Sequence, residues 1–141
     1  MSLNLPEDCR KSCVMIIDDI SFYGSMIEQI LKNGRFEGKI LHANSLKKAV
    51  EHIQKSIEEK SSINLLITDL HLPDGLATIL VKKIRQTKSL ENMSIVLVTT
   101  NNEAAKVVEA FEAGIDNYVF KPIDEKVLIE KITQVWKKRN P

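Results

Sequence analysis

Cysteine is scarce in this sequence, and its two cysteines do not form a recognisable pair. Cys9 and Cys13 are separated by three residues, which is not the C-x-x-C spacing of redox and zinc motifs. No second cysteine pair or histidine pair in the sequence completes a zinc site. A disulfide framework and a structural zinc are therefore not expected. We expect two reduced thiols, as is usual in cytoplasmic proteins.

Long hydrophobic runs and an excess of one charge are also missing. The longest apolar runs span about five residues, whereas a membrane helix needs roughly 20. The charged N-terminus around Glu7 and Lys11 has no signal-peptide core. Twenty basic and 19 acidic residues give a formal net charge of +1. That balance does not favour binding to membranes or nucleic acids, so we expect a cytoplasmic protein with neither as a direct partner.

Glycine and proline are few, at 5 and 4 residues, and no linker rich in them divides the chain. A chain of 141 residues is long enough for one domain with a hydrophobic core and too short for two typical ones. We predict an N-terminal extension over residues 1–11 and one folded domain over residues 12–139.

Short apolar segments alternate with segments of helical spacing. The strand candidates are residues 13–17, 39–43, 63–67, 94–98 and 118–120, of which 39–43 is the weakest. The helical stripes are Phe22, Met26 and Ile30; Leu46, Ala49, Val50, Ile53 and Ile57; Leu76, Ile79, Leu80 and Ile84; Ala104, Val107, Val108 and Phe111; and Leu128, Ile132 and Val135. Five repeats of strand and helix predict an α/β fold, a (βα)5 doubly wound five-stranded parallel sheet with right-handed crossovers.

Acidic, hydroxyl and basic side chains follow the predicted strands directly. They are Asp18 and Asp19 after the first strand, Asp69 after the third, Thr99 and Thr100 after the fourth, and Lys121 after the fifth. In a doubly wound sheet the ligand site lies beyond the carboxyl ends of the strands, so we expect these side chains to converge on one rim. Carboxylates about 4 Å apart repel by roughly 4 kcal/mol at an effective dielectric near 20. Such a group would either bind protons or recruit a cation.

The expected cation is Mg²⁺, which prefers oxygen ligands and commonly uses one or two carboxylates. We predict Asp19 and Asp69 as ligands, Asp18 as a ligand directly or through water, and a backbone carbonyl just after Asp69. A carboxylate beside Mg²⁺ can attack phosphorus and form an acyl phosphate, and phosphoryl transfer otherwise needs mainly positioning and charge neutralisation. Asp69 is therefore a candidate phosphorylation site, with Lys121 and Thr99 as groups that bind phosphoryl oxygens.

Simpler roles exist for the same residues. Asp18 or Asp19 could cap the following helix, although one carboxylate would suffice for that. Lys121 could be an ordinary solvated charge. The combination of the acidic pair with Asp69 favours the metal site.

Four segments together resemble the receiver domain of bacterial two-component response regulators, of the single-domain, chemotaxis-regulator type. They are MIIDDIS, LLITDLHLP, IVLVTT and NYVFKP, and the resemblance covers roughly residues 12–137. It implies a flavodoxin-like receiver fold. It also implies that Asp69 accepts phosphate from the phosphohistidine of a sensor histidine kinase or a phosphotransfer protein. Asp18, Asp19 and Asp69 would bind Mg²⁺ together with the backbone carbonyl of His71.

The resemblance assigns the remaining site residues as well. Thr99 and Lys121 would hold the phosphoryl group; their separation of 22 residues fits the family, whereas Thr100 takes a place usual for a small residue. Tyr118 occupies the position of a switch aromatic that turns inward behind the fourth-strand hydroxyl, with plain core packing as the alternative. The Lys121–Pro122 peptide bond is expected to be cis, as is typical of the family.

Two departures from the family pattern concern spacing. The Pro-Asp-Gly segment at residues 73–75 is contiguous, whereas receivers usually have two more residues between the proline and Asp-Gly. The loop into the third helix is therefore shorter. The interval from Asp19 to Asp69 is longer than usual, and we assign the surplus to an extended second helix around residues 56–62.

The implied function is a signalling switch and not a turnover enzyme. Phosphorylation would change the surface of the fourth helix, fifth strand and fifth helix, which binds a downstream effector protein. Two alternatives are a phosphorylation-independent pseudo-receiver scaffold and a receiver fragment of a larger multidomain protein. An aspartyl-phosphate phosphatase would need D-x-D after the first strand, and a flavodoxin-like binding module would need a glycine- and hydroxyl-rich loop there. The segment DDIS provides neither.

Overall fold

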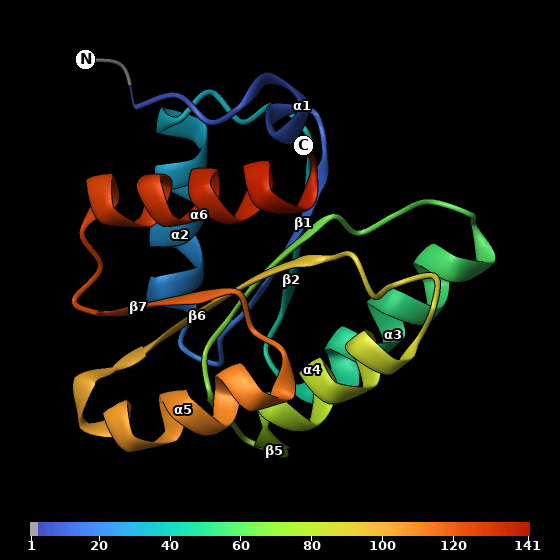
Figure 1. The fold of residues 1–141 in the computed structure, drawn as a ribbon, viewed down its shortest axis with the longest axis vertical. Coiled ribbons are helices and arrows are strands. Elements are labelled where there is room, and N and C mark those ends of the chain that lie inside the picture. The colour runs from blue at the N-terminus through green and yellow to red at the C-terminus, as the bar shows by residue number, and fades with distance from the viewer. Residues whose placement is uncertain (1–2) are drawn as a thin grey trace.

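The computed structural model describes residues 3–141, apart from the side chain of Asn101. Within this range a parallel sheet of five strands has the order β2-β1-β3-β6-β7 (Figure 1). The strands are β1 (Cys13–Ile17), β2 (Lys39–Ala43), β3 (Leu65–Thr68), β6 (Ser94–Thr100) and β7 (Asn117–Lys121). The predicted (βα)5 fold is confirmed. Because the strand order reverses between β1 and β3, their carboxyl ends form the crevice where ligands bind in such sheets.

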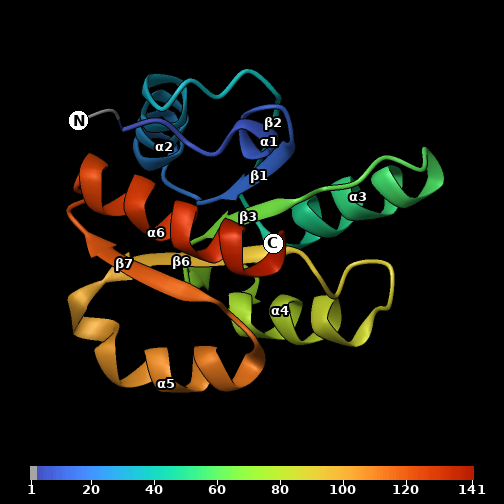
Figure 2. The same ribbon diagram turned by 45° about the horizontal axis from the view of Figure 1, so that its top comes forward.

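Helices cover both faces of the sheet. The short α1 (Glu7–Arg10), α2 (Ser21–Asn33) and α6 (Glu125–Arg139) lie on one face, and α3 (Leu46–Glu58), α4 (Ala77–Gln86) and α5 (Ala104–Ala113) lie on the other (Figures 1 and 2). A hairpin of β4 (His71–Leu72) and β5 (Gly75–Leu76) follows β3, and a 3-10 turn, η1 (Asn101–Glu103), precedes α5. Among the helices of residues 3–141, none is both long enough and apolar enough to cross a membrane.

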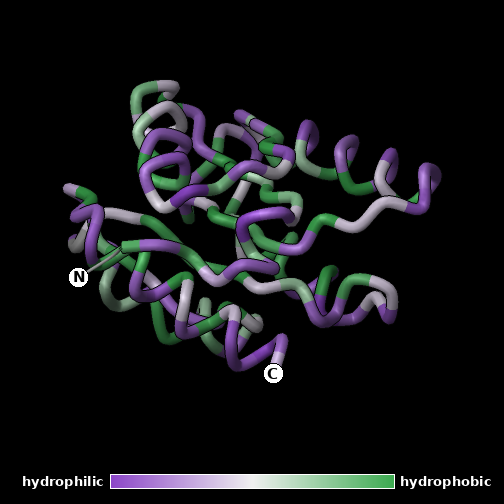
Figure 3. The backbone as a smooth tube through the Cα atoms, turned by 90° about the horizontal axis from the view of Figure 1, so that it is seen from above, coloured by the Kyte–Doolittle hydropathy of each residue, from purple (hydrophilic) through white to green (hydrophobic). Residues whose placement is uncertain are grey.

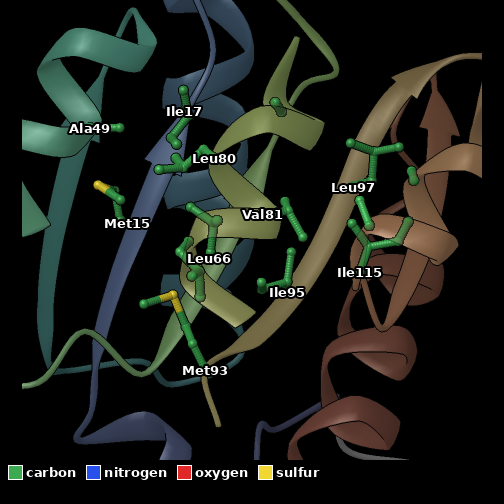
Figure 4. Packing of buried hydrophobic residues seen from close by; sticks show 14 of the residues in the cluster. Met15, Ile17, Ala49, Leu66, Leu80, Val81, Met93, Ile95, Leu97 and Ile115 are labelled. Atoms are coloured by element: carbon green, nitrogen blue, oxygen red, sulfur yellow. The ribbon is translucent and has the colours of Figure 1, made fainter. Parts of the chain in front are cut away.

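The central strands are apolar on both faces, as a sheet covered by helices on both sides requires. Alternate residues of one strand enter different hydrophobic clusters: Leu66 packs toward α3, α4 and α5, and Leu65 toward α2 and α6. Figure 4 shows part of the first cluster, with Leu66 of the sheet near Leu80 of α4, and Leu97 of the sheet near Ile115. In Figure 3 the hydrophobic colour is concentrated inside the molecule, while the helices alternate between hydrophobic and hydrophilic residues.

Residues 3–11 of the predicted extension pack against the face of α2 and α6. Leu5 is 2% exposed and Cys9 is fully buried, and both belong to that face's hydrophobic cluster. Burial raises the pKa of the Cys9 thiol to about 12, so the thiol is neutral and unreactive near neutral pH. The structure shows both cysteines as free thiols. Met1 and Ser2 of the predicted extension lie outside the described residues.

The predicted extension of the second helix is wrong. The corresponding helix, α3, ends at Glu58, because Lys60 adopts a left-handed conformation with φ of 53°. The backbone N–H groups of Lys60 and Ser61 donate to the carbonyls of Ile57 and Ser56, which closes the helix end. The surplus residues therefore form a loop that leads into the amino end of β3, at the opposite end of the strand from Asp69.

Several residues that we assigned to the apolar stripes are exposed. They are Phe22, Ile57, Ile79, Val108 and Phe111. A helix on a sheet buries only the residues that face the strands, so Val107 is 6% exposed while Val108, the next residue round α5, is 62% exposed. The sequence pattern therefore predicted the correct helices but stripes that were too wide.

Candidate functional site

The ends of β1 and β3 bring the acidic residues together. The two strands pair directly, and the backbone N–H of Asp69 donates to the carbonyl of Ile17 at 2.9 Å. Asp18 and Asp69 therefore leave the sheet side by side. Asp18, Asp19 and Asp69 each offer a carboxylate oxygen within 4.8 Å of the others. The structure thus brings the three predicted acidic residues into one cluster.

Lys121 reaches this cluster from the end of β7. Its ammonium Nζ lies 2.9 Å from Asp18 Oδ2 and 2.9 Å from Asp69 Oδ2, and its side chain is only 4% exposed. The side chain of Asp18 is 1% exposed and that of Asp69 is 13% exposed. Lys121 is therefore not a solvated surface charge; it bridges two carboxylates inside the site.

The electrostatics of the cluster follow from burial and pairing. Burial raises the pKa of Asp18 above its ordinary value, although the Ile20 backbone N–H and Lys121 both favour its ionised form. Burial lowers the pKa of Lys121, but its hydrogen bonds and charge pairing with Asp18 and Asp69 outweigh burial, so that pKa is raised. When every group is ionised, three carboxylates and one ammonium carry a net charge of −2. This charge and the all-oxygen donor set fit a divalent cation such as Mg²⁺.

An open hollow of about 410 Å³ adjoins the acidic cluster between α2, the end of β2 and the start of α3. Polar and charged side chains line much of it, among them Asp19, Ser21, His42 and Lys48. Asp19 is exposed at this side of the cluster, while Asp18 is buried beneath it. The acidic cluster is therefore buried at Asp18 and accessible to solvent and ligands at Asp19.

The two threonines at the end of β6 differ in their surroundings. Thr99 is 1% exposed and pairs with Phe120 in the sheet register. Thr100 is exposed, pairs with Lys121 in the sheet register and donates a hydrogen bond to the side chain of Asn102. The two hydroxyls therefore differ: that of Thr100 has a hydrogen-bond partner in the following loop, whereas that of Thr99 is buried within the sheet. The role of Thr99 in binding a phosphoryl group stays a prediction.

Tyr118 packs with two other aromatic residues on the α5 side of the sheet. Its ring centroid is 6.0 Å from that of Phe111, nearly perpendicular to it, and 5.1 Å from that of Phe120. The Lys131 ammonium lies 5.4 Å from the Tyr118 ring centroid. The ring is half-buried, so the packing that we considered as an alternative is present. Inward rotation of Tyr118 as a switch stays a prediction.

His71 joins two loops at the mouth of the site. Its imidazole Nε2 lies 3.0 Å from Glu103 Oε2, and this hydrogen bond lowers the pKa of Glu103. Glu103 is also 3.6 Å from the Lys106 ammonium. The contact ties the segment after Asp69 to the end of η1, directly before α5, and sequence spacing did not predict it. The backbone carbonyl of His71 as a metal ligand stays a prediction.

The shortened loop after Asp69 is anchored by its own acidic residue. The carboxylate of Asp74 accepts hydrogen bonds from the backbone N–H groups of Leu46 at 2.8 Å and Lys47 at 2.9 Å. Asp74 therefore caps the N-terminus of α3 from a distant segment, and these bonds lower its pKa. Gly75, with φ of 144°, allows the tight turn between β4 and β5.

Tyr23 is a site residue that the sequence analysis missed. The Lys121 ammonium lies over the Tyr23 ring, 3.9 Å from its centroid. Tyr23 is in the first turn of α2, four residues after Asp19, and that turn begins beside the carboxyl ends of the strands. The sequence did show an aromatic residue four positions after Asp19, and this was the signal from which a contact with Lys121 could have been predicted. The Lys121–Pro122 peptide bond is cis, which is the isomer that the family resemblance predicted.

Comparisons with known proteins agree with this arrangement. The family model of the response regulator receiver domain matches residues 14–133. A chemotaxis protein CheY homolog of Campylobacter jejuni is 33% identical over 122 residues, which are 86% of this chain and 90% of that protein. Chemotaxis protein CheY1 of Helicobacter pylori is 31% identical, with 86% of this chain and 94% of that protein covered.

A solved structure of a receiver domain has the same fold. A CheY-like response regulator receiver domain protein from Methanospirillum hungatei JF-1 superposes with a TM-score of 0.77 at 25% identity. The match covers 92% of this chain and 97% of that one. The acidic cluster and the bridging lysine lie where the receiver fold has its strand-order reversal. The chain belongs to the response regulator receiver domain family.

Proposed function

We propose that this receiver domain is a phosphorylation switch in which Asp69 accepts a phosphoryl group from the phosphohistidine of a sensor histidine kinase or a phosphotransfer protein. The observation that carries the proposal is the bridge from Lys121 to Asp18 and Asp69 at 2.9 Å each, inside a cluster of three carboxylates. A purely structural role does not require four charged groups at this place, because buried charges are costly.

Asp18, Asp19 and Asp69, with the backbone carbonyl of His71, would hold the Mg²⁺ ion. Their carboxylates lie close enough together to share one ion, and oxygen donors are the ligands that Mg²⁺ prefers. When bound, Mg²⁺ supplies positive charge next to the phosphoryl oxygens.

The residues of the chain perform the remaining steps. A carboxylate oxygen of Asp69 forms the bond to phosphorus while the bond from phosphorus to the donor's imidazole nitrogen breaks, and that nitrogen takes up a proton. The Lys121 ammonium moves its hydrogen bond from Asp69 Oδ2 to a phosphoryl oxygen, and the Thr99 hydroxyl donates to another. These contacts neutralise the negative charge of the phosphoryl oxygens, which the acyl phosphate places next to the Asp18 and Asp19 carboxylates.

The phosphorylated state then shifts the population between two conformations. Thr99 is drawn toward the phosphoryl group and Tyr118 turns inward behind it, which changes the surface of α5, β7 and α6. A downstream effector protein in the cytoplasm recognises that surface. The protein would catalyse its own phosphorylation without turning over a substrate.

The test is the intact mass of the protein after incubation with a small phosphoramidate donor, with and without Mg²⁺. We expect a single phosphoryl adduct in wild type and in Asp74→Asn, a control that alters a nearby aspartate outside the cluster. We expect none in Asp69→Asn or without Mg²⁺. An adduct in Asp69→Asn, or no adduct in wild type under any condition, would contradict the proposal. The second result would favour a phosphorylation-independent scaffold.

A further inference from the structure

The Lys121 ammonium has three N–H donors, and the structure provides a partner on three sides. Asp18 and Asp69 each accept one hydrogen bond at 2.9 Å. The face of the Tyr23 ring lies 3.9 Å from Nζ, measured to the ring centroid. Because the lysine side chain is only 4% exposed, the ring takes a place that water fills around an exposed ammonium.

An aromatic face suits a cation that must change partners. It attracts the ammonium through its quadrupole, and this attraction is larger when the cation is shielded from water. Unlike a third carboxylate or a carbonyl, it does not bind one N–H in a fixed direction. The ammonium can therefore turn from Asp69 toward a phosphoryl oxygen while the ring keeps it inside the site.

The ring is held by the same short turn that holds the acidic residues. The Asp18 carboxylate accepts a hydrogen bond from the Ile20 backbone N–H at 2.9 Å, and the Ile20 carbonyl accepts one from the Tyr23 backbone N–H at 3.0 Å. Tyr23 itself is half-buried and lies outside both hydrophobic clusters of the domain. Its contact with Lys121 is therefore not a by-product of core packing.

We propose that Tyr23 is a positioning residue for phosphoryl transfer, which keeps the Lys121 ammonium aimed at the phosphoryl oxygens. The inference rests on the proposed function. It makes the aromatic ring the important part of Tyr23, because the ring face and not the hydroxyl contacts the ammonium. A phenylalanine at position 23 should therefore preserve the rate of phosphoryl transfer. A leucine, which is similarly hydrophobic but has no ring, should not.

The experiment compares initial rates of phosphorylation by the phosphoramidate donor at saturating Mg²⁺. We expect Tyr23→Leu to slow the reaction about fivefold to thirtyfold, which corresponds to about 1–2 kcal/mol for a desolvated cation–π contact. Tyr23→Phe should keep the wild-type rate. The control is Ile57→Ala, which shortens an exposed apolar side chain (48% exposed) near the C-terminal end of α3, and its rate should be unchanged. Phe22 is unsuitable as a control because its ring packs edge-on against that of Tyr23, with the centroids 5.4 Å apart.

A second readout separates positioning from general damage. The Lys121 ε-methylene protons lie near the ring, so their NMR signals should be shifted upfield in wild type and Tyr23→Phe, and this shift should disappear in Tyr23→Leu. The rise in melting temperature on adding Mg²⁺ should persist in all variants. A wild-type rate in Tyr23→Leu, or an equal loss in Tyr23→Phe, would overturn the inference alone. No adduct in wild type would overturn the proposed function and, with it, any role of Tyr23 in transfer.

Discussion

Replacing Lys121 by methionine removes one charge from the acidic site while keeping most of the side chain's length. In the wild type, the ammonium lies 2.9 Å from two carboxylate oxygens in a nearly water-free position. Opposite charges at that distance attract by about 6 kcal/mol at an effective dielectric near 20, and the cost of burying them offsets much of this. Removing one partner of a buried pair nevertheless costs about 3–5 kcal/mol, because the other charges stay uncompensated.

We therefore expect Lys121→Met to lower the free energy of unfolding by about 3–5 kcal/mol in the absence of Mg²⁺. The corresponding fall in melting temperature is about 10–20 °C for a domain of this size. The folded pKa of Lys121 lies above its ordinary value of 10.5. The stabilisation from the ammonium is therefore fully present at neutral pH and is lost only as pH rises through the folded pKa. Urea and thermal denaturation at neutral pH measure the effect.

The matched control is Lys32→Met. The Lys32 ammonium also lies 2.9 Å from a carboxylate oxygen, that of Glu28, but its side chain is 55% exposed. Exposed pairs contribute at most about 1 kcal/mol, so this variant should be nearly as stable as the wild type. Mg²⁺ should restore part of the stability lost in Lys121→Met, since the remaining carboxylates attract the cation more strongly. If Lys121→Met cost no more than Lys32→Met, the electrostatic description of the site would be wrong.

Three further predictions concern the rest of the domain. Asp116→Ala removes the carboxylate that pairs with the guanidinium groups of Arg85 and Arg139, at 3.0 and 2.8 Å. This loss should lower the free energy of unfolding by about 2–3 kcal/mol, and an unchanged midpoint in urea denaturation would refute this. The pKa of Asp74 is lowered from 3.8. The ionised Asp74 carboxylate therefore stabilises the fold above about pH 4, and this stabilisation is lost as pH falls through the folded pKa. Asp74→Asn should make the free energy of unfolding fall less steeply at acid pH than in the wild type, and an equally steep fall would contradict the cap. Mg²⁺ at ten times its dissociation constant should add about 1.4 kcal/mol to the free energy of unfolding, and Asp19→Asn should reduce that increment at the same Mg²⁺ concentration.

The edge of the sheet that carries the acidic cluster was predictable because its residues depend on sequence order and topology alone. Once a parallel sheet is inferred, residues just past each strand must meet at one edge, which placed Asp18, Asp69 and Lys121 together. No side-chain conformation had to be known. The direct contact of Lys121 with both carboxylates follows from the length of lysine and the pairing of β1 with β3.

The missed features depend on contacts between segments that sequence spacing does not relate. Asp74 caps a helix whose first residue precedes it by 28 positions, and His71 meets Glu103 only because two loops lie at the same edge. The end of α3 depended on one left-handed residue, Lys60, which no apolar pattern marks. Tyr23 was missed since the stripe through Phe22 directed attention to the wrong face of the first turn.

The most direct test of the central claim is the position of the phosphoryl group. After incubation with the phosphoramidate donor and Mg²⁺, borohydride reduction converts an aspartyl phosphate to homoserine, which peptide mass spectrometry can place. The account predicts homoserine at residue 69 and unmodified aspartate at Asp18 and Asp19. Homoserine at either of those residues, or at none of the three, would contradict it.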